Sequence, residues 1–255
     1  MFVIEGIISE LQVAPGKENL LQRLDKHYKG KGALTGMGAV VGGMYGQVAN
    51  AAMLAMYDGE DTENFLCLLG DKVMCGTFGG ASKLPEGQKV KVVVHKQGEV
   101  FVAKGILSED KGLVWLDYPL GWKAERAANF KLAGWLYLFG IFGMFLFGLI
   151  GGDLGDDDFW TLFQTVAIGG GAIVGGMAFW NSSTMNSLAD PATEVFRKLG
   201  FAEPEKVNLN SYRYGIVHGH ELLHTDEINA NHFNVHCYKK AIEDGKLKMA
   251  SESGA

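Results

Sequence analysis

The chain has 255 residues, a formal net charge of −6 and 47% hydrophobic residues, and its mean hydropathy is +0.06. This acidic balance excludes a basic nucleic-acid footprint, so we expect no nucleic-acid partner. The 36 glycines and the positive hydropathy are unusual for an ordinary soluble domain. The three cysteines show no CxxC spacing, which predicts reduced thiols instead of a disulfide framework.

Residues 1–122 have the pattern of a β-rich cytoplasmic domain. Segments rich in β-branched and aromatic residues alternate there with turn signals, for example at Gly70 and Asp71. These predicted strands are residues 2–13, 65–69, 72–78, 89–95, 99–107 and 113–118. About six strands of this length can close a small barrel of the OB or SH3 kind.

A Gly/Ala-rich stretch of uncharged residues, 32–57, interrupts this domain. Its length would suffice to cross a membrane, but its glycines and its two side-chain amides, Gln47 and Asn50, weaken that interpretation. We interpret it as a packed or surface-lying helix inserted in a barrel loop. Insertion into the membrane remains the alternative.

Two uncharged runs follow, Leu132–Gly152 with 21 residues and Phe159–Trp180 with 22 residues. At a rise of ~1.5 Å per residue, each run is long enough for a hydrocarbon core of ~30 Å. Tryptophan and tyrosine side chains lie towards the ends of the runs, where aromatic belts belong. The sequence therefore predicts a transmembrane hairpin over residues 130–182.

The predicted tip of this hairpin, residues 153–158, is acidic. Its four carboxylates are Asp153, Asp156, Asp157 and Asp158. Lysine and arginine occur only in the flanks, at Lys123, Arg126, Lys131, Arg197 and Lys198. This asymmetry predicts a multi-pass protein of the bacterial inner membrane with both termini in the cytoplasm and the tip outside. Binding of a divalent cation by the aspartates is the alternative use of the tip.

Glycines within the runs have small-xxx-small spacing. Two such pairs are Gly148 with Gly152 and Gly171 with Gly175. This spacing lets helices approach closely in a membrane. We expect these glycines to pack between the two spans or between the subunits of a homo-oligomer.

The order of these features along residues 1–210 resembles a family of bacterial membrane proteins described as type VI secretion system effectors. The resemblance includes "FLCLLGDKVMCGTF" in the β-rich part and "VFRKLGFAEPEKV" after the hairpin. It implies a role in competition between bacteria, as an effector, an immunity protein or an accessory protein. Residues 211–255 are not covered by it.

Residues 183–255 are predicted to form a helical, histidine-rich cytoplasmic tail. Within it, "HELLH" matches the zinc-protease motif, with His220 and His224 as metal ligands and Glu221 as general base. Glu243 lies where one class of such enzymes supplies a third ligand. Asp226 interrupts the apolar pattern expected after the motif, so we predict no working protease site and no cofactor, with zinc as the alternative.

The sequence as a whole predicts an α+β membrane protein that is not an enzyme and that forms homo-oligomers. Its expected role is immunity or accessory function through binding a cognate toxin or a secretion component. A membrane-permeabilising effector is one alternative, and a zinc metalloprotease is the other.

Overall fold

The computed structural model describes residues 1–15, 62–98, 100–151, 155, 157–218 and 234–250. The chain divides into two compact units. The first consists of Met1–Leu120 and Ala192–Ala255, and the second is Gly121–Pro191. The insertion predicted at residues 32–57 lies outside the described residues.

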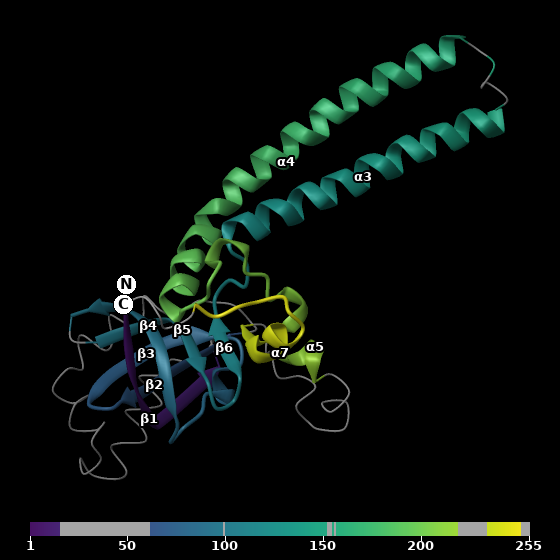
Figure 1. The fold of residues 1–255 in the computed structure, drawn as a ribbon. Coiled ribbons are helices and arrows are strands. Elements are labelled where there is room, and N and C mark those ends of the chain that lie inside the picture. The colour runs from purple at the N-terminus through teal and green to yellow at the C-terminus, as the bar shows by residue number, and fades with distance from the viewer. Residues whose placement is uncertain (16–61, 99, 152–154, 156, 219–233, 251–255) are drawn as a thin grey trace. The chain divides into compact units, whose positions relative to one another are not determined.

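The first unit contains a five-stranded β-barrel (Figure 1). Its strands are β1 (Phe2–Pro15), β2 (Glu63–Leu69), β3 (Lys72–Phe78), β4 (Lys89–Gln97) and β5 (Val100–Ser108). β1 pairs antiparallel with both β2 and β4, β2 pairs with β3, and β4 pairs with β5. A parallel pairing of β3 with β5 closes the barrel. This order, with its parallel closure, is the Greek key of the OB fold and decides between the two predicted barrel kinds.

β1 serves two neighbours because it bends in the middle. Residues 2–7 pair with β4, and the second half of the strand pairs with β2. The register with β2 shifts between Ser9 and Gln12, and Glu10 between them has a positive φ of 52°. Such an irregularity increases the local bend of a strand, which curvature into a barrel requires.

All six predicted strands are present, but the sixth lies beside the barrel. β6 (Leu113–Leu116) pairs with the second half of β5, whose first half contacts β3. A seventh strand, β7 (Val235–Cys237), then pairs with β6. Three residues are too few to give a recognisable alternation of apolar and polar residues, so the sequence did not reveal β7.

Two groups of apolar side chains hold the first unit together. The interior of the barrel contains Phe65, Met74, Val92, Ile106 and Trp115, all fully buried. The Trp115 indole N–H donates a hydrogen bond of 3.0 Å to the carbonyl of Gly80. The polar atom of this large core side chain is thereby satisfied, as buried indoles usually are.

The second apolar group lies on the outer face of β4, β5 and β6. It is formed by Val93, Leu107, Val114 and Leu116 from the strands and by Val195, Phe196 and Leu199 from the last turns of a long helix. α7 (Tyr238–Glu243) adds Tyr238 and Ala241. The residues after 192 therefore belong to the barrel unit and do not form a separate tail.

The predicted helical tail thus has a mixed structure where it is described. It contains the short helices α5 (Tyr214–Val217) and α7, the 3-10 turns Pro204–Lys206 and Asn210–Tyr212, and strand β7. Val235 and Cys237 of β7 enter the barrel core. The described apolar residues of this segment complete the sheet and the second apolar group.

The second unit contains two long helices that run antiparallel (Figure 1). They are α3 (Trp122–Gly151) and α4 (Asp157–Leu199), whose last turns belong to the first unit. α3 contains residues 132–151 of the first predicted uncharged run, and α4 contains the whole of the second. Each helix extends beyond its run on the side away from the tip.

Candidate functional site

The surface of the two helices is the most prominent functional feature of the described chain. Both are long and apolar enough to cross a membrane, and only 6% of the most apolar 18-residue window of each is buried. Phe139, Ile150 and Trp180 are 78%, 85% and 78% exposed. Apolar side chains on this scale rarely remain exposed to water. Length and composition therefore indicate association with a membrane.

A tyrosine joins the two helices within their apolar region. The Tyr137 hydroxyl of α3 donates a hydrogen bond of 2.7 Å to the carbonyl of Ala167 in α4. Gly171 lies beside this ring, and a Cβ there would make an ordinary van der Waals contact of 3.5 Å with the hydroxyl oxygen, so the position could also hold an alanine. A partly buried hydroxyl without a partner is costly, so this bond helps to fix the level at which the helices meet.

Near the tip, a glycine of α3 accommodates an aromatic ring of α4. A Cβ at Gly148 would overlap the ring of Phe159. Gly148 is buried, and Phe159 is 9% exposed. The helices can approach closely at this point because Gly148 has no side chain.

The other glycines of the predicted packing pairs differ in their surroundings. A Cβ at Gly175 would have no atom of the described residues within 4 Å. Gly175 therefore borders open space and does not pack against the described part of α3. Gly152 lies outside the described residues.

Two of the four tip aspartates are described. Asp157 and Asp158 occupy the first turn of α4, where a carboxylate is favourable beside the positive end of the helix dipole. Asp153 and Asp156 lie outside the described residues. Asp157 and Asp158 thus have a structural use at the start of α4 that needs no bound cation.

Polar side chains lie at the opposite end of the hairpin, which we call the hairpin base. Asn181 of α4 donates a hydrogen bond of 3.1 Å to the Asn129 side-chain oxygen of α3. Asn129 in turn donates a bond of 3.1 Å to Glu125, whose residue is only 7% exposed. Sequence reasoning missed this cluster, although "NSSTMN" directly after an apolar run was an available signal.

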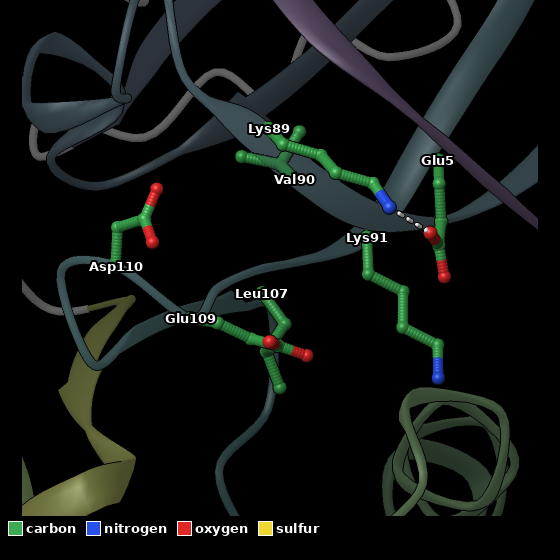
Figure 2. Close-up of a pocket in the computed structure, with 7 residues that line it drawn as sticks. All are labelled: Glu5, Lys89, Val90, Lys91, Leu107, Glu109 and Asp110. Atoms are coloured by element: carbon green, nitrogen blue, oxygen red, sulfur yellow. Dashed lines mark ion pairs between the residues drawn. The ribbon is translucent and has the colours of Figure 1, made fainter.

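A shallow hollow of about 110 Å³ lies on the barrel surface (Figure 2). It is lined by Glu5, Lys89, Val90, Lys91, Leu107, Glu109 and Asp110. Lys89 forms an ion pair of 2.7 Å with Glu5. The hydrogen bond from Lys89 lowers the pKa of Glu5, and the same bond raises the pKa of Lys89. Charges of both signs border the hollow, which suits a polar protein surface better than a small ion of one sign.

The cysteines are free and buried. Cys67 lies opposite Met74 across β2 and β3, whereas Cys75 lies opposite Leu66. Because neighbouring residues of a strand point to opposite faces, the Cys67 and Cys75 side chains lie on opposite sides of the sheet. Burial raises the pKa of Cys75 to about 12 and that of Cys237 to about 11, so these thiols are poor nucleophiles.

The histidine motif falls outside the described residues, which include neither His220, Glu221 nor His224. Glu243, the proposed third ligand, is described: it lies in α7 and its side chain is 68% exposed, 3.9 Å from the Lys240 ammonium. Among the described residues, no three metal-ligating side chains come together. Zinc binding by the motif stays a sequence-based alternative.

Comparisons with protein-family models, with curated proteins and with solved structures find no match to this chain.

Proposed function

We propose that the protein is a resident inner-membrane protein of bacteria that presents an OB-type barrel at the cytoplasmic face and binds a protein partner there. Within type VI secretion-linked competition, its role is immunity or accessory function. The partner is a cognate toxin or a component of the secretion system. Binding, and no chemical reaction, is the activity.

The observation that carries this proposal is the exposed apolar surface of α3 and α4. Leu136 and Ile168 are 63% and 77% exposed, as lipid-facing side chains are. Lys123, Arg126 and Lys131 precede the first apolar run, and the loop between the helices contains no lysine or arginine. This distribution supports a cytoplasmic barrel unit.

The barrel surface supports the binding role. The hollow bordered by Lys91, Glu109 and Asp110 offers cations and anions side by side. Complementary charges of this kind steer association and select partners. The resemblance along residues 1–210 to proteins of type VI secretion supports the choice of partner.

Protection from a toxin tests the proposal. Cells that lack the gene should be inhibited by the toxin encoded beside it, and expression of the intact chain should restore growth. Lys91→Glu should weaken co-purification with that toxin, whereas Lys72→Glu, the same charge change at an exposed site away from the hollow, should not. Inhibition of growth that expression does not relieve would reject the immunity role.

A membrane-permeabilising effector is a second candidate, and one observation favours it. Gly140, Gly143 and Gly175 leave open space on the helix surfaces, where helices of several subunits can approach one another. Leakage of a dye from vesicles after addition of purified protein, together with loss of membrane potential in expressing cells, would support this candidate over the resident role.

A further inference from the structure

Polar atoms without a partner gather at the hairpin base. In the described part of the second unit, three buried side-chain atoms make no hydrogen bond: Arg126 Nε, Ser182 Oγ and Asn186 Oδ1. Ser182 is 1% exposed. A buried hydroxyl or guanidinium N–H without a partner is costly, so each such group in a folded protein indicates something that satisfies it.

These three atoms lie at one level of the hairpin. The hydrogen bond between Asn129 and Asn181 sets the register of the two helices there. Arg126 lies three residues from Asn129, about 4.5 Å further from the tip at the helical rise of 1.5 Å per residue. Ser182 and Asn186 lie about 1.5 and 7.5 Å beyond Asn181 in the same direction. The level of Arg126 therefore falls between theirs.

Ser182 and Asn186 also share a face of α4, because they are four residues apart. Ala178 and Ala189, which are 5% and 0% exposed, lie on the same side of the helix. The pair thus lies on the buried side of α4 and not on the side that faces lipid. At this level Arg126 of α3 offers an N–H donor, Ser182 of α4 offers a hydroxyl and Asn186 of α4 offers an amide.

The charge at this level is positive. The Arg126 guanidinium lies 5.5 Å from the centre of the Trp122 ring, and the Lys123 ammonium lies 5.2 Å from the same centre. Glu125, the nearby carboxylate, accepts a hydrogen bond from Asn129. A stacked guanidinium keeps a fork of N–H donors that matches the oxygens of a phosphate group.

The height of the cluster matches the lipid headgroups. Arg126 precedes Leu132, the start of the uncharged run, by six residues, or about 9 Å along the helix. The polar layer of a bilayer adds about 5–8 Å on each side of its hydrocarbon core. The Arg126 side chain can therefore reach the phosphates of the same leaflet.

We propose that the hairpin base binds the headgroup of an anionic phospholipid with a polyol head. Arg126 and Ser182 donate hydrogen bonds to its phosphate oxygens, and Asn186 accepts one from a headgroup hydroxyl. The site rests on the membrane residence proposed above. Such a site would make the second unit bind anionic phospholipids in preference to the other lipids that surround it.

The test uses the full chain in detergent, titrated with phosphatidylglycerol or with phosphatidylcholine, and measures bound lipid by native mass spectrometry. Phosphatidylglycerol should bind at least about tenfold more tightly than phosphatidylcholine, as hydrogen bonds to a charged group allow. Arg126→Gln and Ser182→Ala should remove most of this preference. Lys131→Gln is the matched control, because it removes the same charge about 140° around the helix and should retain the preference.

Thermal unfolding completes the test. Phosphatidylglycerol should raise the melting temperature of the unaltered protein and of Lys131→Gln but not that of Arg126→Gln, whose melting temperature without lipid shows whether it folds. Equal binding of both lipids, or an equal loss in Lys131→Gln, would overturn the site. The same stabilisation by millimolar inorganic phosphate would overturn its assignment to a lipid. Extraction of the protein from membranes by carbonate would instead reject membrane residence itself.

Discussion

Gly105 is the residue that lets a helix reach the sheet. It lies in β5, and a Cβ there would lie 2.5 Å from Val195 Cγ1 in the last turns of α4. Leu116 and Leu199 also approach within 4 Å of that position. Contact between strand and helix at this distance is possible only without a side chain, so the second apolar group of the barrel unit depends on one absent methyl group.

Gly105→Ala should destabilise the barrel unit by about 1–3 kcal/mol, because Val195 cannot yield without moving the helix. The control is Gly215→Ala in α5, where the added Cβ meets no atom of the described residues within 4 Å and alanine favours the helix. Heating in the presence of a fluorogenic thiol reagent measures the effect, since all three cysteines are buried in this unit. Equal melting temperatures for the two variants would contradict the proposed contact.

His236 of β7 is fully buried and makes the first unit sensitive to acid. Its Nδ1 lies 3.2 Å from the Asn234 carbonyl, and its Nε2 has no hydrogen-bond partner among the described residues. Burial lowers the pKa of His236 to about 4, and the Arg213 charge lowers it further while the Asn234 carbonyl opposes the shift. The folded chain therefore holds this histidine neutral.

Because the unfolded chain binds a proton at the ordinary pKa of ~6.5, stability is fully present above that pH and is lost as pH falls towards about 4. Between pH 7 and pH 5 this histidine should remove about 2 kcal/mol from the free energy of unfolding. Urea titrations in detergent at both pH values, followed by tryptophan fluorescence, measure the loss. His236→Gln should reduce it, and an unchanged pH dependence in that variant would assign the loss to other groups.

Among the elements, α3 and α4 contact each other near both ends and in the middle of the described hairpin. Tyr137 contacts Ala167 in the apolar region, Gly148 accommodates Phe159 near the tip, and Asn129 contacts Asn181 at the base. Between these points, large apolar side chains are exposed. Each of these contacts should therefore have a measurable effect on the stability of the hairpin.

Gly148→Ala should weaken the hairpin, because the added methyl group overlaps the Phe159 ring and forces the helices apart near the tip. Gly140→Ala, on the same helix and with open space around it, is the matched control. Cysteines placed at Asn129 and Asn181 form a disulfide only while the helices are adjacent, so crosslinking at increasing SDS fractions measures hairpin stability. Equal SDS midpoints for the two variants would reject the contact.

The sequence predicted the elements whose signal is local. β-branched runs between turn residues identified six strands, and two charge-free runs identified two long helices. The choice between OB and SH3 topologies depends on the pairing of Met74 and Cys75 with Phe101 and Val102, residues far apart in the chain. No local pattern encodes that pairing, and for the same reason the contact of Gly105 with Val195 could not be predicted.

The candidate site was predictable to a similar extent. The uncharged runs predicted the apolar surface of the two helices, and the lysine and arginine residues in the flanks predicted its orientation. Small-xxx-small spacing drew attention to Gly148, but the partner that it contacts in α4 is the Phe159 ring. The hairpin base was not predicted, because Arg126 and Ser182 are far apart in the chain. Only the pairing of the two helices brings them to one level.

At the scale of the whole molecule, the distribution of charge predicts the side of the membrane on which each unit lies. Single cysteines at Asp157 and Asp110 test it, because the native cysteines are buried and give little background. A membrane-impermeant maleimide should label Asp157→Cys in intact spheroplasts and Asp110→Cys only after lysis. Labelling of Asp110→Cys in intact spheroplasts would place the barrel unit outside and reject the cytoplasmic orientation.

The division of the chain also determines the order in which its parts are made. The first unit is discontinuous, since Met1–Leu120 precedes the helices and Ala192–Ala255 follows them. A ribosome therefore delivers the barrel strands first, while Val93, Leu107 and Val114 still lack Phe196, Leu199 and Tyr238 against them. Their burial must wait until both helices have been synthesised. With the membrane residence proposed above, insertion of the helices becomes a step in the folding of the barrel unit, and a nascent chain that fails to insert keeps an apolar surface that quality-control proteases can recognise.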